Sequence, residues 1–526
     1  MSAPRSAHVQ AALDPVADWD VIVIGGGITG AGITLEAARR GLKVLLLEQR
    51  DFAWGTSSRS SKLVHGGLRY IQQGRFFLTR DSVRERQALM SGACGLVEPQ
   101  SFAFADYRGR RPGRWLFSLG LAIYDAMAGQ RARHYFRADE FLGLAPHILR
   151  AGLKGGLCYS DAKTDDARLV LRVLQQAQAY GATALNYVAV ESIMYTAERA
   201  HGVVARDAQT GTLLTLQAKT VINATGAWAD RLRAQQGAAA RLRPLRGSHV
   251  ILPSWRLPVA QAVSLMHPID GRPVFIYPWE GATLVGTTDV DHTDDLQQEA
   301  AITAAELAYL MVALTFQFPA LALTRADIIA SYAGVRPVVG SGKADPSKET
   351  RDHAICLERG LLTVAGGKLT TFRLIALDAL RQLAPLLPAW RPDWRNTALF
   401  DVSAECFAPP GLPASQTARL AGHYGALAAQ VLAAAQTGEL ELIAGTLTLW
   451  VELRWAARCE AVCHLEDLLL RRTRIGLLLR GGGVAQLPRI RAICQPELGW
   501  DDARWEQEVA AYLLLWQTCH ALPATE

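Results

Sequence analysis

The sequence contains no long hydrophobic run, and no stretch approaches the roughly 18 uninterrupted apolar residues of a membrane-spanning helix. Residues 1–18 hold no continuous apolar segment, so we expect no secretory signal there but a flexible N-terminal segment. These absences predict a protein that is soluble or attached to one face of a membrane.

Paired cysteines and a strong excess of one charge are lacking as well. The eight cysteines form no Cys-x-x-Cys pair, which is typical of free thiols in a reducing compartment. Cys459, Cys463 and His464 lie close in sequence, but without a second ligand cluster we predict no metal site. The net charge of +6 suits acidic substrates or anionic lipid and is weaker than that of a nucleic-acid binder.

Size and composition predict a globular protein with more than one domain. The 526 residues exceed what one hydrophobic core accommodates, and 50% of them are hydrophobic while 20% are charged. Pro385, Pro388 and Pro392 interrupt the preceding pattern and predict a domain boundary. Residues 400–526 beyond it have a helical pattern.

The most informative feature that is present is a strand, glycine turn and helix near the amino end. An apolar run leads directly into Gly25-x-Gly27-x-x-Gly30, and a second apolar run ends in Glu48. The glycines permit a tight turn, close approach of a pyrophosphate, and close packing of helix on strand. The helix start offers N–H groups to phosphates, and an acid about 20 residues later accepts hydrogen bonds from a ribose. We therefore predict a dinucleotide site.

Two further turns favour FAD over NAD. Residues 223–226 (Asn-Ala-Thr-Gly) end a predicted strand, where small side chains let the backbone pass close to a bound adenosine. Residues 366–368 (Gly-Gly-Lys) open a predicted helix, whose N–H groups would stabilise negative charge on a reduced flavin.

Periodicity predicts several other elements. Helices are predicted at 79–90, 165–180, 303–316 and 372–383, and strands within 200–225 and at 248–252, 273–277 and 282–286.

The segment 108–124 has two interpretations, which the sequence leaves open. Its arginines are followed by five large apolar residues, Trp115, Leu116, Phe117, Leu119 and Leu121. Such a segment is typical of an element at a membrane interface. The alternative is a helix whose apolar face packs inside a domain.

The run Ser-Ser-Lys-Leu-Val-His-Gly-Gly-Leu-Arg-Tyr at 60–70, preceded by Thr-Ser-Ser at 56–58, is a specific motif. Further segments accompany it at 23–32, 159–169, 246–249, 286–289, 332–337, 351–353 and 366–371, with 466–474 in the tail. Through these segments, which occur in the family's order, the chain resembles the FAD-dependent glycerol-3-phosphate dehydrogenases, the respiratory, quinone-linked kind, within the superfamily of D-amino acid and glycine oxidases.

This resemblance implies an α/β fold with a doubly wound, Rossmann-like FAD-binding domain of the D-amino acid oxidase type. An antiparallel-sheet substrate domain would be threaded through it, and a helical C-terminal domain would follow. The expected FAD-binding parts are about 19–75, 155–245 and 345–388, within a region 19–388. The substrate domain would take about 76–154 and 246–344, and the C-terminal domain 389–526.

The glycine turns and the resemblance together assign the cofactor-binding residues. They are Gly25, Gly26, Gly27, Gly30, Glu48, Thr56, Ser57, Ser61, Lys62, His65, Gly66, Gly67, Ala224, Gly226, Gly367, Lys368, Leu369 and Thr370. The family's covalent-flavin relatives use a histidine or cysteine link that we do not identify here, so we expect non-covalent FAD. Trp54-Gly55 departs from the family, where smaller residues are usual, and a short 351–366 segment predicts a trimmed hairpin.

A phosphate dianion needs several fixed cations, and arginine meets it bidentately. Four cations lie in or beside loops marked by glycine or proline: Arg69, Arg336, Arg351 and Lys368. The resemblance implies substrate contacts by Arg69, Tyr70, Arg336 and Lys368, with Arg351 as support.

Oxidising an alcohol also needs a base for the hydroxyl proton. His249 is our candidate, with Arg336 as the second catalytic residue. His65 is the competitor, although its loop lies along the cofactor in the family.

The resemblance implies oxidation of sn-glycerol 3-phosphate to dihydroxyacetone phosphate, with hydride passing to FAD and electrons to a membrane quinone. The alternatives are an oxidase that uses oxygen and a non-catalytic flavin-binding redox sensor. We expect a cytoplasmic protein held peripherally on the anionic surface of the inner membrane, without nucleic acid. The oligomeric state stays open, with a homodimer as one alternative.

Overall fold

The computed structural model describes Val9 and residues 18–68, 71, 74–110, 113–129, 131–197, 199–340, 352–395, 397–401, 409 and 411–524. Most of the expected N-terminal segment 1–18, and the predicted substrate residues Arg69, Tyr70 and Arg351, therefore lie outside the described residues.

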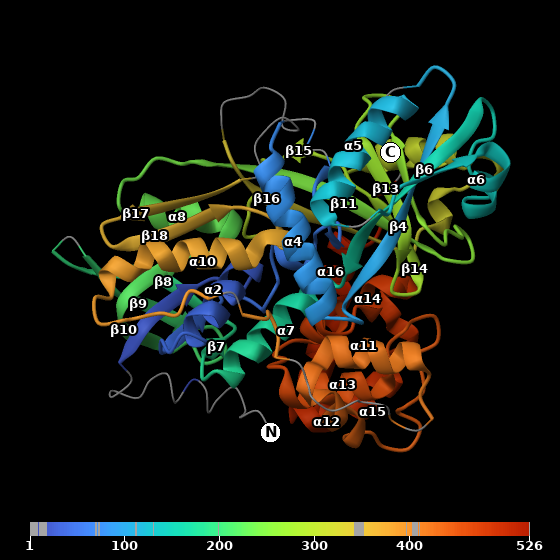
Figure 1. The fold of residues 1–526 in the computed structure, drawn as a ribbon. Coiled ribbons are helices and arrows are strands. Elements are labelled where there is room, and N and C mark those ends of the chain that lie inside the picture. The colour runs from blue at the N-terminus through green and yellow to red at the C-terminus, as the bar shows by residue number, and fades with distance from the viewer. Residues whose placement is uncertain are drawn as a thin grey trace.

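The first sheet is mainly parallel and contains the predicted strand-turn-helix (Figure 1). Along its path the strands are β17 (His353–Glu358), β18 (Leu361–Gly366), β10 (Leu213–Asn223), β1 (Trp19–Ile24), β2 (Val44–Leu47) and β7 (Thr183–Leu185). Strands β18, β10, β1, β2 and β7 run parallel, while β17 pairs with β18 as the expected short hairpin. The pair β8 (Val188–Thr196) and β9 (Arg199–Asp207) extends from β10.

Helices cover one face of this sheet. The helices α2 (Ile28–Ala38), α7 (Asp166–Ala179) and α10 (Phe372–Leu383) pack together on it. Strand β2 is wholly buried, as expected for a parallel strand covered on both faces. The short helix α8 (Ala229–Ala234) follows β10.

The second sheet is mainly antiparallel. Its path is β15 (Val290–Asp291), β11 (Leu242–Pro253), β14 (Ala282–Gly286), β13 (Pro273–Trp279), β12 (Ala262–Met266), β4 (Val97–Tyr107), β6 (Leu153–Thr164) and β3 (Leu63–Val64). β16 (Ala330–Val339) pairs with β11, and β5 (His134–Arg137) with β6. The helices beside it are α4 (Phe76–Gly92), α5 (Arg114–Ala128), α6 (Ala138–Leu144) and α9 (Ala304–Gln317).

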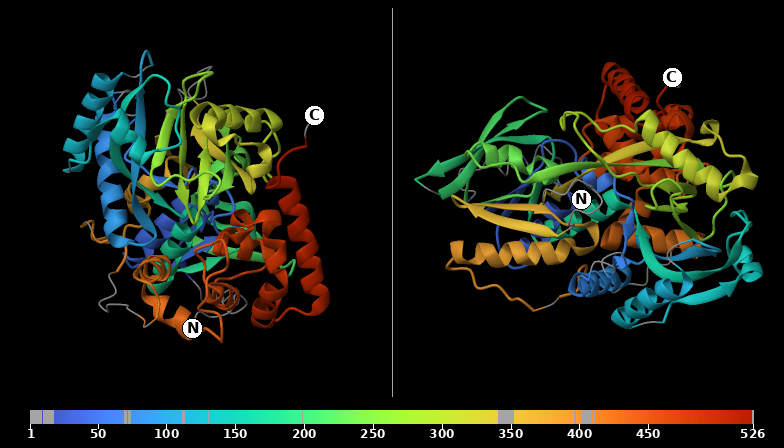
Figure 2. Two further views of the ribbon diagram at one scale, coloured as in Figure 1. Left: turned by 90° about the vertical axis from the view of Figure 1, so that its right-hand side faces the viewer. Right: turned by 90° about the horizontal axis from the view of Figure 1, so that it is seen from above.

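The C-terminal region is helical, as predicted. It comprises α11 (Ala414–Tyr424), α12 (Ala428–Ala433), α13 (Trp450–Cys459), a π-helical turn (Asp467–Arg472), α14 (Ile475–Leu478), α15 (Leu487–Leu498) and α16 (Asp502–Cys519). In orange and red, it lies beside α7 and β16, at one end of the molecule (Figures 1 and 2).

This architecture confirms the predicted α/β fold, and α4, α7, α9 and α10 confirm the four predicted helices. At one place the sheets differ from the expected division of the chain. Strand β6 was placed mostly with an FAD-binding part, yet it pairs with β4 along nearly its whole length in the second sheet. The exact domain bounds stay predictions.

In the described parts of the chain, no helix combines the length and the hydropathy that crossing a bilayer requires.

Candidate active site

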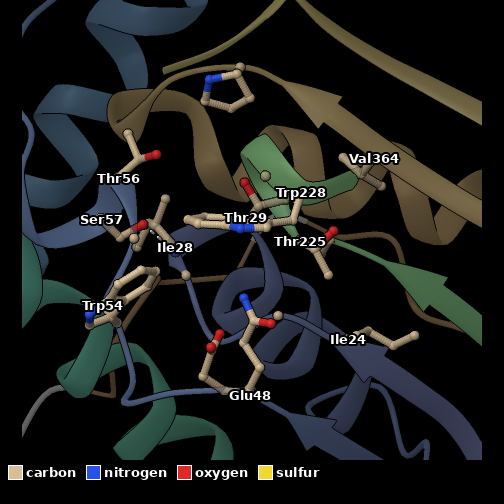
Figure 3. Close-up of a pocket in the computed structure, with 18 of the residues that line it drawn as sticks. Ile24, Ile28, Thr29, Glu48, Trp54, Thr56, Ser57, Thr225, Trp228 and Val364 are labelled. Atoms are coloured by element: carbon tan, nitrogen blue, oxygen red, sulfur yellow. Dashed lines mark hydrogen bonds between the residues drawn. The ribbon is translucent and has the colours of Figure 1, made fainter. Parts of the chain in front are cut away.

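A cavity opens at the carboxyl ends of β1, β2, β10 and β18. Parallel strands end at the same edge of a sheet, so the turns that follow them meet there. We call this space the dinucleotide cavity; Figure 3 shows side chains from these separate segments around it. Of the predicted cofactor residues, those that line it are Gly25, Gly27, Glu48, Thr56, Ser57, Ala224, Gly226, Gly367, Lys368 and Leu369.

The glycine turn forms a cradle in which side chains have no room. Gly25 has φ of +111°, and a Cβ there would lie 2.6 Å from the Ala224 carbonyl oxygen. A Cβ on Gly30 would overlap the Gly25 carbonyl oxygen. Gly27 is the residue before α2 and gives the helix no side-chain cap, while the first N–H of the helix, on Ile28, donates to Ser57 Oγ at 2.9 Å. The positive end of the helix and the Ser57 hydroxyl therefore lie together at the place for an anion. This backbone fits a pyrophosphate.

Glu48 is held at the end of β2 by backbone donors. Its Oε2 accepts the Gly26 N–H at 2.6 Å and its Oε1 accepts the Arg50 N–H at 2.8 Å. Burial raises the pKa of this carboxyl from 4.5, against the two hydrogen bonds that lower it. Gly26 thus shapes the cavity through Glu48 rather than by lining it. The contact of Glu48 with a ribose hydroxyl stays a prediction, and its position in the cavity lining fits it.

Aromatic side chains that the sequence did not assign also line this cavity. Trp54 and Trp228 lie with ring centroids 5.6 Å apart (Figure 3), and the Arg50 guanidinium lies 4.3 Å from the Trp54 centroid. Arg231, in the first turn of α8, lines the cavity as well. The sequence feature that could have indicated Trp54 and Trp228 is their position just after the segments 48–52 and 223–226, which border the cavity.

A second cavity adjoins the first, and we call it the substrate cavity. Both are lined by Thr56, Ser60, Pro337, Gly367, Lys368 and Leu369, so they meet between the 56–62 loop and the turn before α10. Of the other predicted residues, those that line the second cavity are Ser61, His65, Gly67, Arg336 and Thr370. Apolar and aromatic side chains complete its lining: Leu63, Leu68, Phe102, Tyr159 and Phe275.

Four cations of the described part of the chain line the substrate cavity: Arg59, which pairs with Glu299, and the three residues Arg272, Arg336 and Lys368. Arg336 donates from Nη1 to Asp289 Oδ1 at 2.9 Å and from Nη2 to Thr287 Oγ1 at 3.1 Å. Arg272, which the sequence did not assign, donates from Nη1 to the Asp289 carbonyl oxygen at 2.7 Å. Lys368, in the turn after β18, lines this cavity and the dinucleotide cavity. Two arginines and a lysine around one small space fit an anionic substrate.

His249 lies behind the cavity wall rather than in it. Its Nε2 is 2.9 Å from Ser61 Oγ, and its ring stacks on Tyr332 at 4.7 Å between centroids. Burial holds the pKa of His249 well below 6.5, with contributions from the Arg336 and Lys62 charges. Among the described residues, Nδ1 has no hydrogen-bond partner. The imidazole is therefore neutral near pH 7.

Comparison with known proteins identifies the family. The family described as FAD dependent oxidoreductase matches residues 20–373, and the C-terminal domain of alpha-glycerophosphate oxidase matches residues 385–505. "Glycerol-3-phosphate dehydrogenase 2" of Mycobacterium bovis is 36% identical over 94% of this chain and 87% of its own length. "Aerobic glycerol-3-phosphate dehydrogenase" of Staphylococcus haemolyticus is 35% identical over 87% of this chain and 86% of its own. The chain belongs to the FAD-dependent glycerol-3-phosphate dehydrogenase family.

Solved structures agree with this assignment. The Bacillus halodurans glycerol-3-phosphate dehydrogenase complexed with FAD has a TM-score of 0.80 at 28% identity, covering 99% of this chain and 98% of that one. L-alpha-glycerophosphate oxidase of Mycoplasma pneumoniae shares the fold, with a TM-score of 0.58 at 19% identity over 73% of this chain and 98% of that one. The cofactor of this dehydrogenase-family chain is FAD, and the glycine cradle with Glu48 fits its dinucleotide part.

Two predicted cofactor residues face away from both cavities of this family member. Lys62 Nζ donates to the Ser58 carbonyl oxygen at 2.8 Å and to Asp166 Oδ1 at 2.9 Å. Gly66 donates its N–H to the Tyr124 hydroxyl at 2.9 Å, and a Cβ there would overlap that hydroxyl. Lys62 thus pairs with a buried carboxylate behind the cavity walls, and Gly66 lies where a side chain has no room.

Proposed function

We propose that the protein oxidises sn-glycerol 3-phosphate to dihydroxyacetone phosphate. The observation that carries this proposal is the cluster of Arg272, Arg336 and Lys368 in a cavity that adjoins the dinucleotide cavity. FAD, when bound, supplies the acceptor for the hydride that leaves the alcohol carbon. The names of the dehydrogenase relatives support the choice of substrate.

The arginine fork accounts for the preference for a phosphorylated alcohol. Asp289 and Thr287 hold the Arg336 guanidinium against the cavity wall, so that less side-chain entropy is lost when a dianion binds. Free glycerol lacks the dianion and would forgo these charge-assisted hydrogen bonds.

His249 remains our candidate for the base, acting on the substrate hydroxyl by way of Ser61. Ser61 lines the cavity and its Oγ lies within hydrogen-bond distance of His249 Nε2. The neutral imidazole accepts a proton there, although its low pKa makes it a weak base.

The experiment is an anaerobic titration of the purified flavoprotein, followed by its visible spectrum. We expect glycerol 3-phosphate to bleach the flavin at millimolar concentration or below, and glycerol to require concentrations higher by about two orders of magnitude. A flavin that glycerol 3-phosphate leaves oxidised would refute the proposal.

We propose a membrane quinone as the next acceptor and a peripheral position on the anionic surface of the cytoplasmic membrane. Support comes from α5, whose first turns expose Trp115, Leu116 and Leu119 at 80%, 67% and 61%. Phe77 at the start of the neighbouring α4 is 75% exposed. Farther along α5, Leu121 and Tyr124 are buried, so the helix both packs inside the protein and presents an apolar end.

Oxygen is the second candidate acceptor, because the C-terminal match is to a domain of alpha-glycerophosphate oxidase. Peroxide yield and quinone reduction, measured on the same preparation, separate the two. Stoichiometric peroxide with negligible quinone reduction would favour the oxidase.

A further inference from the structure

The 56–62 loop lies between the two cavities and is held from behind by buried groups. Thr56, Ser57 and Ser60 line the dinucleotide cavity, while Ser60 and Ser61 line the substrate cavity. The position of this loop therefore sets the walls of both cavities.

One of the groups behind the loop comes from the C-terminal region. Arg474, between the π-helical turn and α14, has a side chain only 2% exposed. It donates from Nη1 to the Ser58 carbonyl oxygen at 3.2 Å, and from Nη2 to Asp165 Oδ1 at 2.8 Å and to Asp166. A single guanidinium thus bridges the loop and the start of α7.

Asp166, which accepts a hydrogen bond from Arg474, also accepts hydrogen bonds from two residues of the loop, Ser60 and Lys62. Its Oδ2 accepts the Ser60 N–H at 2.9 Å and the Ser60 hydroxyl at 2.7 Å. Its Oδ1 accepts Lys62 Nζ at 2.9 Å. Two buried cations, Arg474 and Lys62, therefore balance two buried carboxylates, Asp165 and Asp166. Removing one of these cations would leave a carboxylate buried without a compensating charge. We expect the 56–62 loop to shift in response, because it is bonded to these same groups.

A second link between the C-terminal region and the loop is indirect and runs through Glu299. Arg59 Nη2 lies 2.7 Å from Glu299 Oε2, and the other oxygen of Glu299 lies 3.0 Å from Nε2 of His520, just after α16. Arg59 itself lines the substrate cavity.

We propose that the helical C-terminal region is a positioning element for the FAD site, and that Arg474 is the residue through which it sets the 56–62 loop. This role does not depend on which alcohol is oxidised. It assigns to the C-terminal region a part in holding the cofactor as well as in stabilising the chain.

The test compares Arg474→Met with Arg454→Met, a matched control. Arg454 on α13 is also buried, at 6% exposure, but its ion-pair partners Glu439 and Glu497 both belong to the C-terminal region. The measurements are the dissociation constant of FAD, the visible spectrum of the bound flavin, amide hydrogen exchange at residues 56–62, and the Tm.

We expect both variants to lower the Tm, because each leaves a carboxylate buried and unpaired. Only Arg474→Met should weaken FAD binding, by roughly tenfold or more, and speed exchange at residues 58–62. Arg474→Lys keeps the charge but loses the fork, so it should show a smaller change in the same direction.

Equal FAD affinity and equal exchange in Arg474→Met and Arg454→Met would overturn the proposal, since the arginine would then serve stability alone. If Arg474→Met does not fold, Arg474→Lys decides: unchanged FAD affinity, spectrum and exchange in that variant would equally overturn it.

Discussion

Arg336 and Asp289 form an ion pair of 2.9 Å at the substrate cavity, although 47 positions separate them in the sequence. Arg336 belongs to β16, whereas Asp289 follows the end of β14. The ion pair holds the Arg336 guanidinium in the wall of a cavity that adjoins the dinucleotide cavity.

Arg336→Ala should raise the KM for glycerol 3-phosphate by about 100-fold or more, because a charge-assisted bidentate contact is lost. Steady-state kinetics with a quinone-like dye measure this. The control is Arg243→Ala, which removes an arginine that pairs with Asp291 in the same sheet and lines neither cavity. Similar KM values in both variants would contradict the phosphate-binding role of Arg336.

Gly30→Ala should abolish or strongly weaken FAD binding, since a Cβ would overlap the Gly25 carbonyl oxygen and push α2 off β1. We expect a cost of about 1–3 kcal/mol in stability as well. Gly120→Ala is the control, because a Cβ on this α5 glycine meets open space and should leave FAD binding unchanged. Flavin content after purification and the Tm report both effects. A fully loaded Gly30→Ala protein would show that the close packing is dispensable.

The pH dependence of flavin reduction tests the state of His249. Burial and the nearby cations lower its pKa well below 6.5, so the imidazole is already neutral at and above about pH 6. His249 should therefore produce no acid limb in kcat/KM between about pH 6 and 8. A limb near pH 6.5 that disappears in His249→Asn would show that the histidine titrates normally.

Asp51 should contribute to acid stability. Burial raises its pKa, but Arg472 and Arg471 outweigh burial and hold the pKa below the ordinary 3.8. The stabilisation is present above pH 3.8 and is lost as the pH falls toward the folded-state pKa. Asp51→Asn should lower the Tm at pH 7, and its gap from the wild type should narrow below about pH 4. The control Asp393→Asn removes one partner of an exposed ion pair and should change the Tm little. A Tm difference between Asp51→Asn and the wild type that does not depend on pH would contradict this assignment.

The apolar end of α5 should mediate membrane attachment. Replacing Trp115, Leu116 and Leu119 together by serine should reduce co-sedimentation with anionic vesicles by about tenfold, while flavin reduction by glycerol 3-phosphate stays unchanged. Trp255→Ser is the control, because Trp255 is similarly exposed, at 77%, and lies between β11 and β12. Equal loss in both variants would remove α5 from the membrane contact.

The sequence alone was sufficient for the elements that local periodicity encodes. The turn at Gly25, Gly27 and Gly30, the helices at 303–316 and 372–383 and the helical tail follow from patterns within short windows. The FAD family was also evident from the order of the motifs, and the comparisons confirm it.

The tertiary structure decided where the side chains point. Lys62 and Ser61 are neighbours in one conspicuous motif, yet Ser61 lines the substrate cavity and Lys62 pairs with Asp166. Arg272 carries little signal in sequence but lies beside Asp289, and Arg474 reaches the 56–62 loop from the C-terminal region.

The physical reason is one of range. Glycine turns and helical periodicity are fixed by backbone geometry within a few residues of the chain. The partner of a buried charge is fixed by which distant segment supplies the opposite charge when the sheets and helices pack, and no short stretch of sequence contains that information.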